Sequence, residues 1–189
     1  MKDNLKVKHI TFISLMCALA CIFSLLDRYL STAILTIIPI ISIIIPYMKL
    51  GIANIIIVIM LYTTSFKETL ITVLVKSILT GLIFSILTTF LIGFLGTMLS
   101  FFGMYLLKQT LKDFKYIMFI SMIGGFLHMI GQLIMCFILY GINKINNPVL
   151  IIYIPIILLT GLFSGLIIGL LSKTIIKILH KEFIKWKKK

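Results

Sequence analysis

Long apolar runs separated by short polar segments dominate the pattern of this chain. The first run covers residues 10–26 and follows a short basic leader. Five further runs cover residues 50–62, 69–88, 91–107, 116–140 and 150–176. A helix of about 20 apolar residues crosses the hydrocarbon core of a bilayer, which is roughly 30 Å thick. The pattern therefore predicts an all-α, polytopic membrane protein with six transmembrane helices.

One more apolar stretch, residues 30–47, does not fit this plan because Pro39 and Pro46 interrupt it. Short cytoplasmic loops collect Lys and Arg. If this stretch does not cross, most of the 18 Lys and Arg residues lie on the cytoplasmic side of the membrane, as this rule requires. If it crosses, most of them lie on the outer side. We therefore predict that it is re-entrant or non-crossing, after a first helix that ends at Asp27 and Arg28.

This topology places both termini in the cytoplasm of a cell whose plasma membrane the chain crosses several times. It divides the chain into a basic cytoplasmic leader at residues 1–9, a transmembrane domain at residues 10–176 and a basic cytoplasmic tail at residues 177–189. The tail carries Lys177, Lys181 and Lys185 one turn apart and is expected to face lipid head groups.

The composition agrees with a bilayer environment. Hydrophobic residues make up 61% of the 189 residues, and mean hydropathy is +1.21. The net charge of +13 comes mainly from lysines outside the apolar runs, so it indicates orientation and not nucleic-acid binding. No surface of interleaved arginines and aromatic residues favours a nucleic-acid partner. Three cysteines inside apolar runs are expected to be small buried hydrophobes.

Small residues recur at four-residue spacing, which allows helices to approach closely in lipid. Ser14 and Ala18 form such a pair on the first helix, and it serves either packing within this protein or docking to a partner. Expected helix-packing positions are Gly81, Gly161, Gly165 and Gly169.

Polar side chains at membrane depth are costly and are candidates for function. Lys76 either reaches toward the cytoplasmic interface or faces the bundle interior. His128 and Gln132 share a helical face with Ser121 and Gly125, so we expect that face to point into protein or a cavity, although a lone histidine is often a packing residue.

Polar chemistry in the outer half of the bundle implies a cup open to the outside. It comes from Lys49, Asn54, His128 and Gln132, with Asp27 and Arg28. The first four of these, together with Lys76, are the expected ligand-binding residues.

Several catalytic motifs are absent from the sequence. It has no G-x-x-x-x-G-K-[ST] phosphate loop for ATP. Its five acidic residues never form the Asp-rich clusters that hold magnesium in prenyl-diphosphate chemistry. His128 has no Cys or carboxylate at metal-ligand spacing. We therefore expect no catalytic residues, no metal and no cofactor in this chain.

A set of motifs, in their order along the chain, resembles the Gx transporter family, which often carries the label heptaprenyl diphosphate synthase component I. They are KLGIAN at residues 49–54, FKE at residues 66–68, Lys76 followed by LTG at residues 79–81, and GGFLHMIGQL at residues 124–133. The family is similar to the substrate-binding S components of energy-coupling-factor (ECF) transporters. Lys76 stands where arginine is expected, and Met129 stands where asparagine is expected.

This resemblance implies a six-helix protein that holds a vitamin-like ligand and associates with a coupling transmembrane protein and two ATPases. It also implies that Ser14 and Ala18 dock the coupling protein and that residues 30–47 form a gating loop.

Three functions remain in view. The first is the membrane-embedded substrate-binding subunit of an ECF-type importer. The second is a non-catalytic membrane component of a heptaprenyl diphosphate synthase, and the third is a lipid-interacting structural protein. A cationic or amphipathic vitamin, an isoprenoid precursor and a lipid fragment are all compatible ligands.

Overall fold

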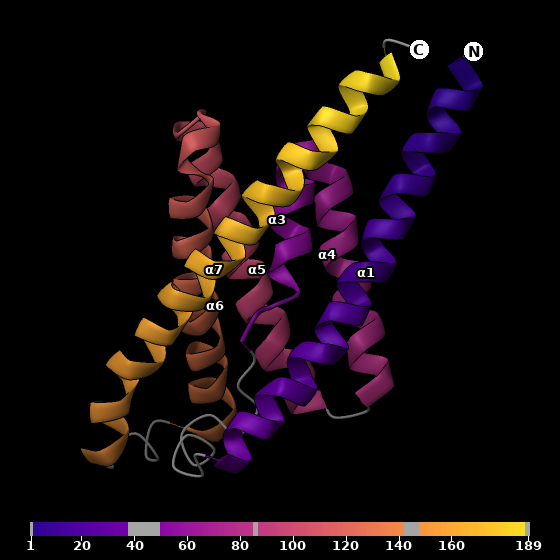
Figure 1. The fold of residues 1–189 in the computed structure, drawn as a ribbon. Coiled ribbons are helices and arrows are strands. Elements are labelled where there is room, and N and C mark those ends of the chain that lie inside the picture. The colour runs from indigo at the N-terminus through magenta and orange to yellow at the C-terminus, as the bar shows by residue number, and fades with distance from the viewer. Residues whose placement is uncertain (1, 38–49, 85–86, 142–147, 188–189) are drawn as a thin grey trace.

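The computed structural model describes residues 2–37, 50–84, 87–141 and 148–187, and Figure 1 shows that these residues are almost entirely helical. This confirms the predicted all-α fold. The elements are α1 (Lys2–Ile37), α3 (Asn54–Thr63), α4 (Phe66–Phe84), α5 (Leu87–Thr110), the short 3-10 helix η1 (Phe114–Tyr116), α6 (Ile117–Tyr140) and α7 (Pro148–Lys187).

Four helical segments in the described residues are long and apolar enough to cross a membrane: His9–Ala33, Leu87–Thr110, Phe114–Tyr140 and Ile154–His180. The remaining two α-helices differ from these for separate reasons. Helix α3 is apolar but has only 10 residues. Helix α4 carries Lys67, Glu68 and Lys76.

The short helix α3 is the centre of the bundle. All residues from Asn54 to Leu61 are buried, and the helix contacts α1, α4, α5 and α7. In Figure 1, α3 lies between α1 and α7. The longer helices therefore cover α3 on all sides, and its polar first residue lies deep inside the protein.

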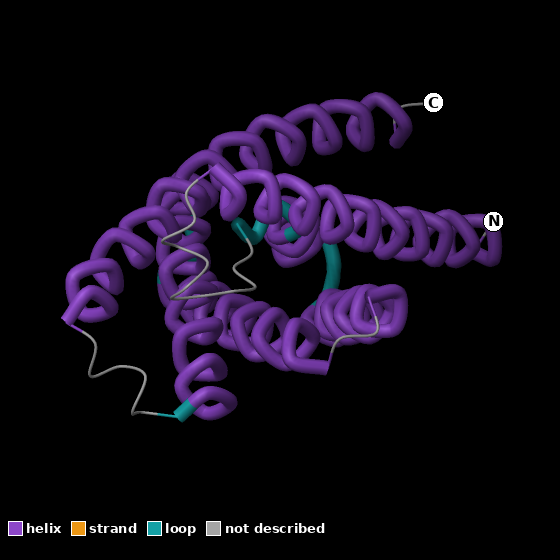
Figure 2. The backbone as a smooth tube through the Cα atoms, turned by 90° about the horizontal axis from the view of Figure 1, so that it is seen from below, coloured by secondary structure: helices purple, strands orange, loops and turns teal. Residues whose placement is uncertain are grey.

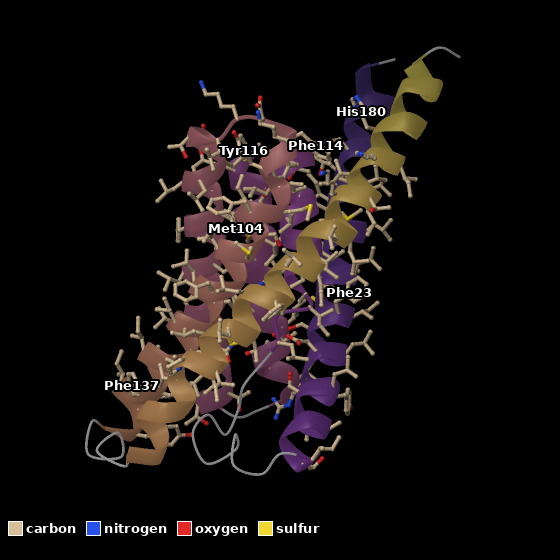
Figure 3. The ribbon with its side chains drawn as sticks, turned by 60° about the vertical axis from the view of Figure 1, so that its left-hand side comes forward. Phe23, Met104, Phe114, Tyr116, Phe137 and His180 are labelled. Atoms are coloured by element: carbon tan, nitrogen blue, oxygen red, sulfur yellow. The ribbon has the colours of Figure 1, made fainter. Side chains whose placement is uncertain are left out.

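The outer faces of the long helices remain apolar. Leu82, Ile138 and Phe163 are 70%, 67% and 66% exposed. Figure 3 shows such side chains projecting outward along the helices. Contact of these side chains with water would cost hydrophobic free energy, whereas contact with lipid tails does not.

Both chain ends lie at the same end of the bundle. Figures 1 and 2 place the N-terminal end of α1 and the C-terminal end of α7 on one side. In Figure 3, Phe114 and Tyr116 lie toward that same end with His180, and Phe137 lies at the opposite end. The connection between α5 and α6 therefore shares the end that carries the termini.

The first helix is longer than the sequence predicts. It does not end at Asp27 and Arg28 but continues to Ile37. The expected leader forms its first turns, and the expected tail forms the last turns of α7 up to Lys187. The helix continues because Asp27, which was expected at the membrane interface, is buried and accepts a hydrogen bond from the backbone before α3. Ser31, one turn further along, does the same.

The predicted re-entrant segment lies outside the described residues over residues 38–49, which include Pro39, Pro46 and Lys49. After it, the predicted run at residues 50–62 becomes helical only at Asn54. Gly51 has a φ of 85°, a left-handed conformation that interrupts a right-handed helix, so α3 begins three residues later.

Glycines bring α6 and α7 into close contact. A Cβ atom on Gly161 would lie 2.8 Å from the carbonyl oxygen of Gly125, and one on Gly165 would lie 2.5 Å from that of Ser121. A Cβ on Gly169 would lie 2.8 Å from Cα of Met118. The three glycines thus face the α6 backbone. Gly81 instead faces a side chain, because its Cβ would lie 2.5 Å from Phe90 Cδ2.

Candidate functional site

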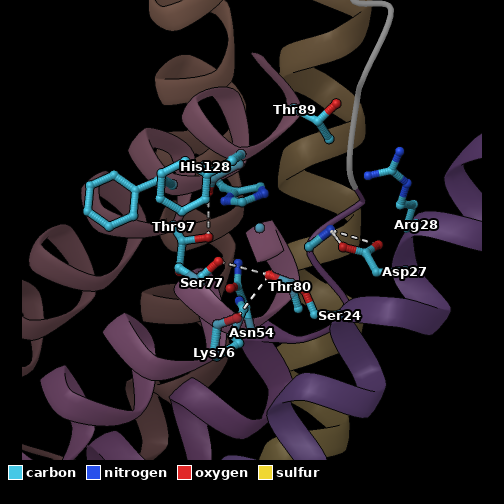
Figure 4. A pocket seen from close by; sticks show the side chains of 15 residues that line it. Ser24, Asp27, Arg28, Asn54, Lys76, Ser77, Thr80, Thr89, Thr97 and His128 are labelled. Carbon is cyan, nitrogen blue, oxygen red and sulfur yellow. Dashed lines mark hydrogen bonds between the residues drawn. The ribbon is translucent and has the colours of Figure 1, made fainter. Parts of the chain in front are cut away.

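A polar pocket lies where α1, the start of α3, α4, α5 and α6 meet (Figure 4). Its free volume is about 20 Å³, which is room for about one water molecule. The lining residues are Ser24, Asp27, Arg28, Gly51, Asn54, Lys76, Ser77, Thr80, Gly81, Thr89, Phe90, Gly93, Phe94, Thr97 and His128.

Helix α1 holds the turn before α3 in place. The backbone N–H of Gly51 donates to both carboxylate oxygens of Asp27, at 3.1 and 3.0 Å. The N–H of Leu50 donates to Oγ of Ser31 at 3.2 Å. Asp27 and Ser31 lie one turn apart on α1, so a single face of this helix positions the turn. Asp27 is 2% exposed, which makes its bond with Gly51 a charge-assisted contact away from water.

The same turn brings Asn54 and His128 together. A Cβ atom on Gly51 would lie 3.1 Å from Nδ2 of Asn54 and 3.3 Å from Cδ2 of His128. These two side chains come from α3 and α6, and both are 3% exposed. The left-handed glycine is therefore what lets the backbone lie against the imidazole and the amide.

Two cations and one carboxylate line the pocket. Lys76 is 5% exposed and lies at the middle of α4, roughly 15 Å from the start of that helix. Arg28 follows Asp27 on α1 and is partly buried. Of the two positions considered for Lys76, the side chain therefore takes the one in the bundle interior. It does not reach toward the cytoplasmic interface.

Two buried polar groups in the lining have no hydrogen-bond partner within the described part of the chain. They are Oδ1 of Asn54 and Oγ1 of Thr89. Other hydroxyls of the lining bond to their own helices, for example Thr97 to the carbonyl of Gly93 at 2.7 Å and Thr80 to that of Lys76 at 2.9 Å. Buried polar groups are normally paired, so Asn54 and Thr89 leave hydrogen-bonding capacity facing the pocket.

The structure brings three of the five predicted ligand-binding residues into one lining: Asn54, Lys76 and His128. Gln132 is fully buried but lies outside the lining, with its Cγ against Gly96 of α5. Lys49 lies outside the described residues.

Sequence reasoning missed the hydroxyl residues of the lining, namely Ser24, Ser77, Thr80, Thr89 and Thr97. Serine and threonine are common in membrane helices because they can bond to the backbone of the preceding turn. The chemistry of these residues at the pocket follows from their positions on different helices, which the sequence does not display.

The small-residue pair on α1 is at the surface. Ser14 and Ala18 are both exposed, so no other described part of this chain packs over them. Packing within this protein was one of two interpretations of this pair, and the exposure of both residues does not support it.

Among the described residues, no group of three or more His, Cys, Asp and Glu side chains is arranged to hold a metal ion. The polar residues of the pocket are mainly hydroxyls, an amide, an imidazole and two cations. Such a set binds by hydrogen bonds and charge.

Comparison with known proteins gives one match. A protein-family model described as heptaprenyl diphosphate synthase component I matches residues 16–175. This range runs from α1 into α7 and includes every residue that lines the pocket. No curated protein and no solved structure matches the chain.

Proposed function

This chain belongs to the heptaprenyl diphosphate synthase component I family, and from this membership and its buried pocket we propose that it is a ligand-binding, non-catalytic membrane component of such a synthase. In this proposal it binds a small molecule inside the bundle, and a separate subunit carries out the chemistry. The ECF-type importer favoured by the sequence motifs becomes the second candidate, because the family match names a synthase component.

The observation that carries the binding role is the polar lining at depth in an apolar bundle. Asp27, Lys76 and His128 are each at most 5% exposed and come from three different helices. Ionisable side chains inside a membrane protein are costly and generally face a pathway or a ligand site. Their convergence on one pocket supports a site that receives a molecule.

The non-catalytic role rests on the sequence. Magnesium-dependent diphosphate chemistry uses several carboxylates close together to hold the metal ions. The five acidic residues of this chain are far apart in sequence, and only one of them lines the pocket. They are Asp3, Asp27, Glu68, Asp113 and Glu182. A soluble prenyl synthase subunit is therefore the proposed partner.

We keep six spans, both termini in the cytoplasm and a plasma-membrane location as parts of this proposal. The shared end of the bundle supports this orientation, because it carries the termini and the lysine-rich connection with Lys112 and Lys115. The basic leader and tail are then cytoplasmic extensions of α1 and α7.

Affinity purification from native membranes tests this function. The tagged full-length chain is extracted in mild detergent, and the bound proteins and retained small molecules are identified by mass spectrometry. A copurifying prenyl synthase together with a retained small molecule supports the proposal. Absence of both, with the protein folded and monodisperse, overturns it and leaves the lipid-interacting structural protein.

The importer function has one structural observation in its favour, which is the exposed pair Ser14 and Ala18 on α1. Close helix contact in lipid needs small residues at such a surface. The partners in this case are a coupling transmembrane protein and ATPases. The same purification separates the two functions, because an ATPase module on the tagged protein favours the importer and a prenyl synthase favours the synthase component.

A further inference from the structure

The lining of the pocket has one more cation than carboxylates. Arg28 and Lys76 carry the positive charges, and Asp27 carries the negative charge. Lys76 is 5% exposed, so bulk water does not solvate its ammonium group. An excess charge in a desolvated site is costly, and charged side chains inside a membrane protein are normally placed beside a counter-charge. The lining therefore needs one further negative charge.

The other acidic residues of the chain lie too far away to supply this charge. Asp3 is in the first turn of α1, and Glu182 is in the last two turns of α7, at the end of the bundle that carries the termini. Asp113 pairs with a surface lysine beyond the end of α5. Glu68 is bonded to Ser65 and His9 and lies roughly 12 Å along α4 from Lys76. The stretches outside the described residues contain no Asp or Glu. The counter-charge must therefore come from outside the chain.

Two polar groups of the lining independently indicate an occupant. Oγ1 of Thr89 and Oδ1 of Asn54 have no hydrogen-bond partner in the described residues, and the two residues are 4% and 3% exposed. A hydroxyl can donate its O–H, and an amide can turn to present its N–H groups. Asn54 is also the first residue of α3, where the helix dipole places a partial positive charge. Both side chains can therefore donate hydrogen bonds to an anion.

The free space restricts this anion to a single atom. The free volume of the pocket is about 20 Å³, which is room for about one water molecule. Carboxylate and sulfate ions have several heavy atoms and fit only if the lining opens. A chloride ion is only slightly larger than a water molecule, and it carries the single negative charge that the lining needs.

We propose that the pocket holds a chloride ion as the counter-ion of its two cations. Thr89 and Asn54 donate hydrogen bonds to the ion, and the start of α3 adds partial positive charge. The ion is a resident of the bundle and is not the ligand of the proposed function, so the inference applies to a synthase component and to an importer alike. Because the free space takes one such ion, a molecule that enters the pocket displaces it.

Thermal unfolding of the full-length protein in an uncharged detergent tests this inference. Sodium chloride and sodium bromide are each exchanged for sodium gluconate at constant ionic strength, so that the screening of surface charges does not change. Chloride and bromide should raise the unfolding midpoint in a saturable manner, because an ion that binds only the folded protein stabilises it. Gluconate should not, because it is too large for the pocket.

Three variants assign the effect to the pocket. Lys76→Met removes the buried charge and should raise the chloride concentration for half-maximal stabilisation at least about tenfold. Thr89→Val removes one hydroxyl at nearly constant volume and should raise this concentration roughly threefold. Lys67→Met removes the same charge from an exposed site on the same helix and should leave it unchanged. Thr89→Val carries the test if Lys76→Met does not purify folded.

Bromide also locates the ion, because its anomalous X-ray scattering should give a peak in the pocket beside Thr89 in crystals grown with sodium bromide. Equal unfolding midpoints in chloride and gluconate would overturn the proposal. Equal chloride dependence in Lys76→Met and Lys67→Met, or bromide peaks at surface lysines alone, would also overturn it. None of these results bears on the proposed function, which depends on the partner and the small molecule that copurify.

Discussion

Asp27 of α1 accepts the backbone N–H of Gly51 through both carboxylate oxygens, at 3.1 and 3.0 Å, across 24 residues of sequence. The contact joins α1, a helix of 36 residues, to the turn that precedes the central helix α3. It also places a carboxylate beside the two cations of the pocket. Asp27 therefore has a structural task that its position at the end of an apolar run would not suggest.

Replacing Asp27 with Ala should destabilise the protein by about 2–4 kcal/mol. The change removes a charged acceptor from a buried N–H and leaves the cations of the pocket without its balancing charge. Asp113→Ala is the control, because Asp113 pairs with Lys115 at 2.9 Å on the surface, where such pairs contribute little. Thermal unfolding in detergent measures both, and equal losses in the two variants would contradict this account of Asp27.

Gly51→Ala should reduce ligand binding, whereas Gly141→Ala should not. Both glycines have positive φ, 85° and 80°, so each substitution costs about 1–2 kcal/mol of backbone strain. The Cβ at Gly51 would lie 3.1 Å from Asn54 and 3.3 Å from His128, but the one at Gly141 would meet nothing within 4 Å. Because the two variants carry similar backbone strain, a difference in ligand binding between them comes from the contacts around Gly51. Equal binding by the two variants would refute the role of Gly51 at the pocket.

Gly125→Ala should destabilise the bundle by about 1–3 kcal/mol despite the higher helix propensity of alanine. Its Cβ would lie 2.9 Å from Cα of Gly165, and backbone atoms of α7 cannot move aside. At Gly103 the new Cβ would meet the end of the Leu127 side chain, which can rotate. Gly103→Ala should therefore be neutral or stabilising. Unfolding midpoints of both variants in the same detergent measure the difference.

Lys108→Met should destabilise the protein by about 1–2 kcal/mol. The ammonium of Lys108 donates to the carbonyl oxygen of Leu61 near the end of α3 and lies 5.1 Å from the centre of the Tyr62 ring. A cation at a helix C-terminus and over an aromatic face is favourable. The exposed Lys112 is the control. If Lys112→Met lowered the unfolding midpoint as much, general surface charge would explain the effect instead.

The start of α4 should lose stability at acidic pH. The N–H of Ser65 donates to Glu68 at 2.9 Å, the N–H of Glu68 contacts Oγ of Ser65 at 3.5 Å, and His9 contacts Glu68 at 2.9 Å. The backbone hydrogen bond from Ser65, and then that from His9, hold the pKa of the Glu68 carboxyl below its usual value of 4.5.

Because the folded pKa is the lower one, Glu68 stabilises the fold above pH 4.5, and this contribution disappears as the pH falls through the folded pKa. Glu68→Gln should remove this part of the pH dependence, and Ser65→Ala should reduce it. Hydrogen exchange of the first turn of α4, followed between pH 3 and pH 6, measures the effect. If hydrogen exchange depended on pH in the same way in Glu68→Gln and in the unchanged protein, Glu68 would not be the source of the pH dependence.

Most of the predicted apolar runs become helices, since composition and run length alone indicate them. The runs at residues 116–140 and 150–176 correspond to α6 and to the larger, N-terminal part of α7. The ends were harder to predict. Helix α1 continues past Asp27 and Arg28 because both side chains turn toward the pocket, and charge in a sequence does not say whether it meets water or protein.

The candidate site was predictable where a polar residue is rare. Lys76 and His128 stand out in apolar helices, whereas Thr89 and Ser24 do not. Gln132 lies one turn from His128 on α6 but falls outside the lining, because Gly96 of α5 packs against it. Periodicity identifies the face of a helix, but the neighbouring helix decides which residues of that face meet the pocket.

The sequence by itself determined the class of protein and the preference for helices, because hydropathy and backbone hydrogen bonding are local properties that lipid makes obligatory. Only the tertiary structure decided that the cations, the amide, the imidazole and the hydroxyls meet at one point. That meeting depends on how five chain segments pack, on a left-handed glycine and on a carboxylate that holds it, and none of these distances is encoded in the spacing of residues along a single helix.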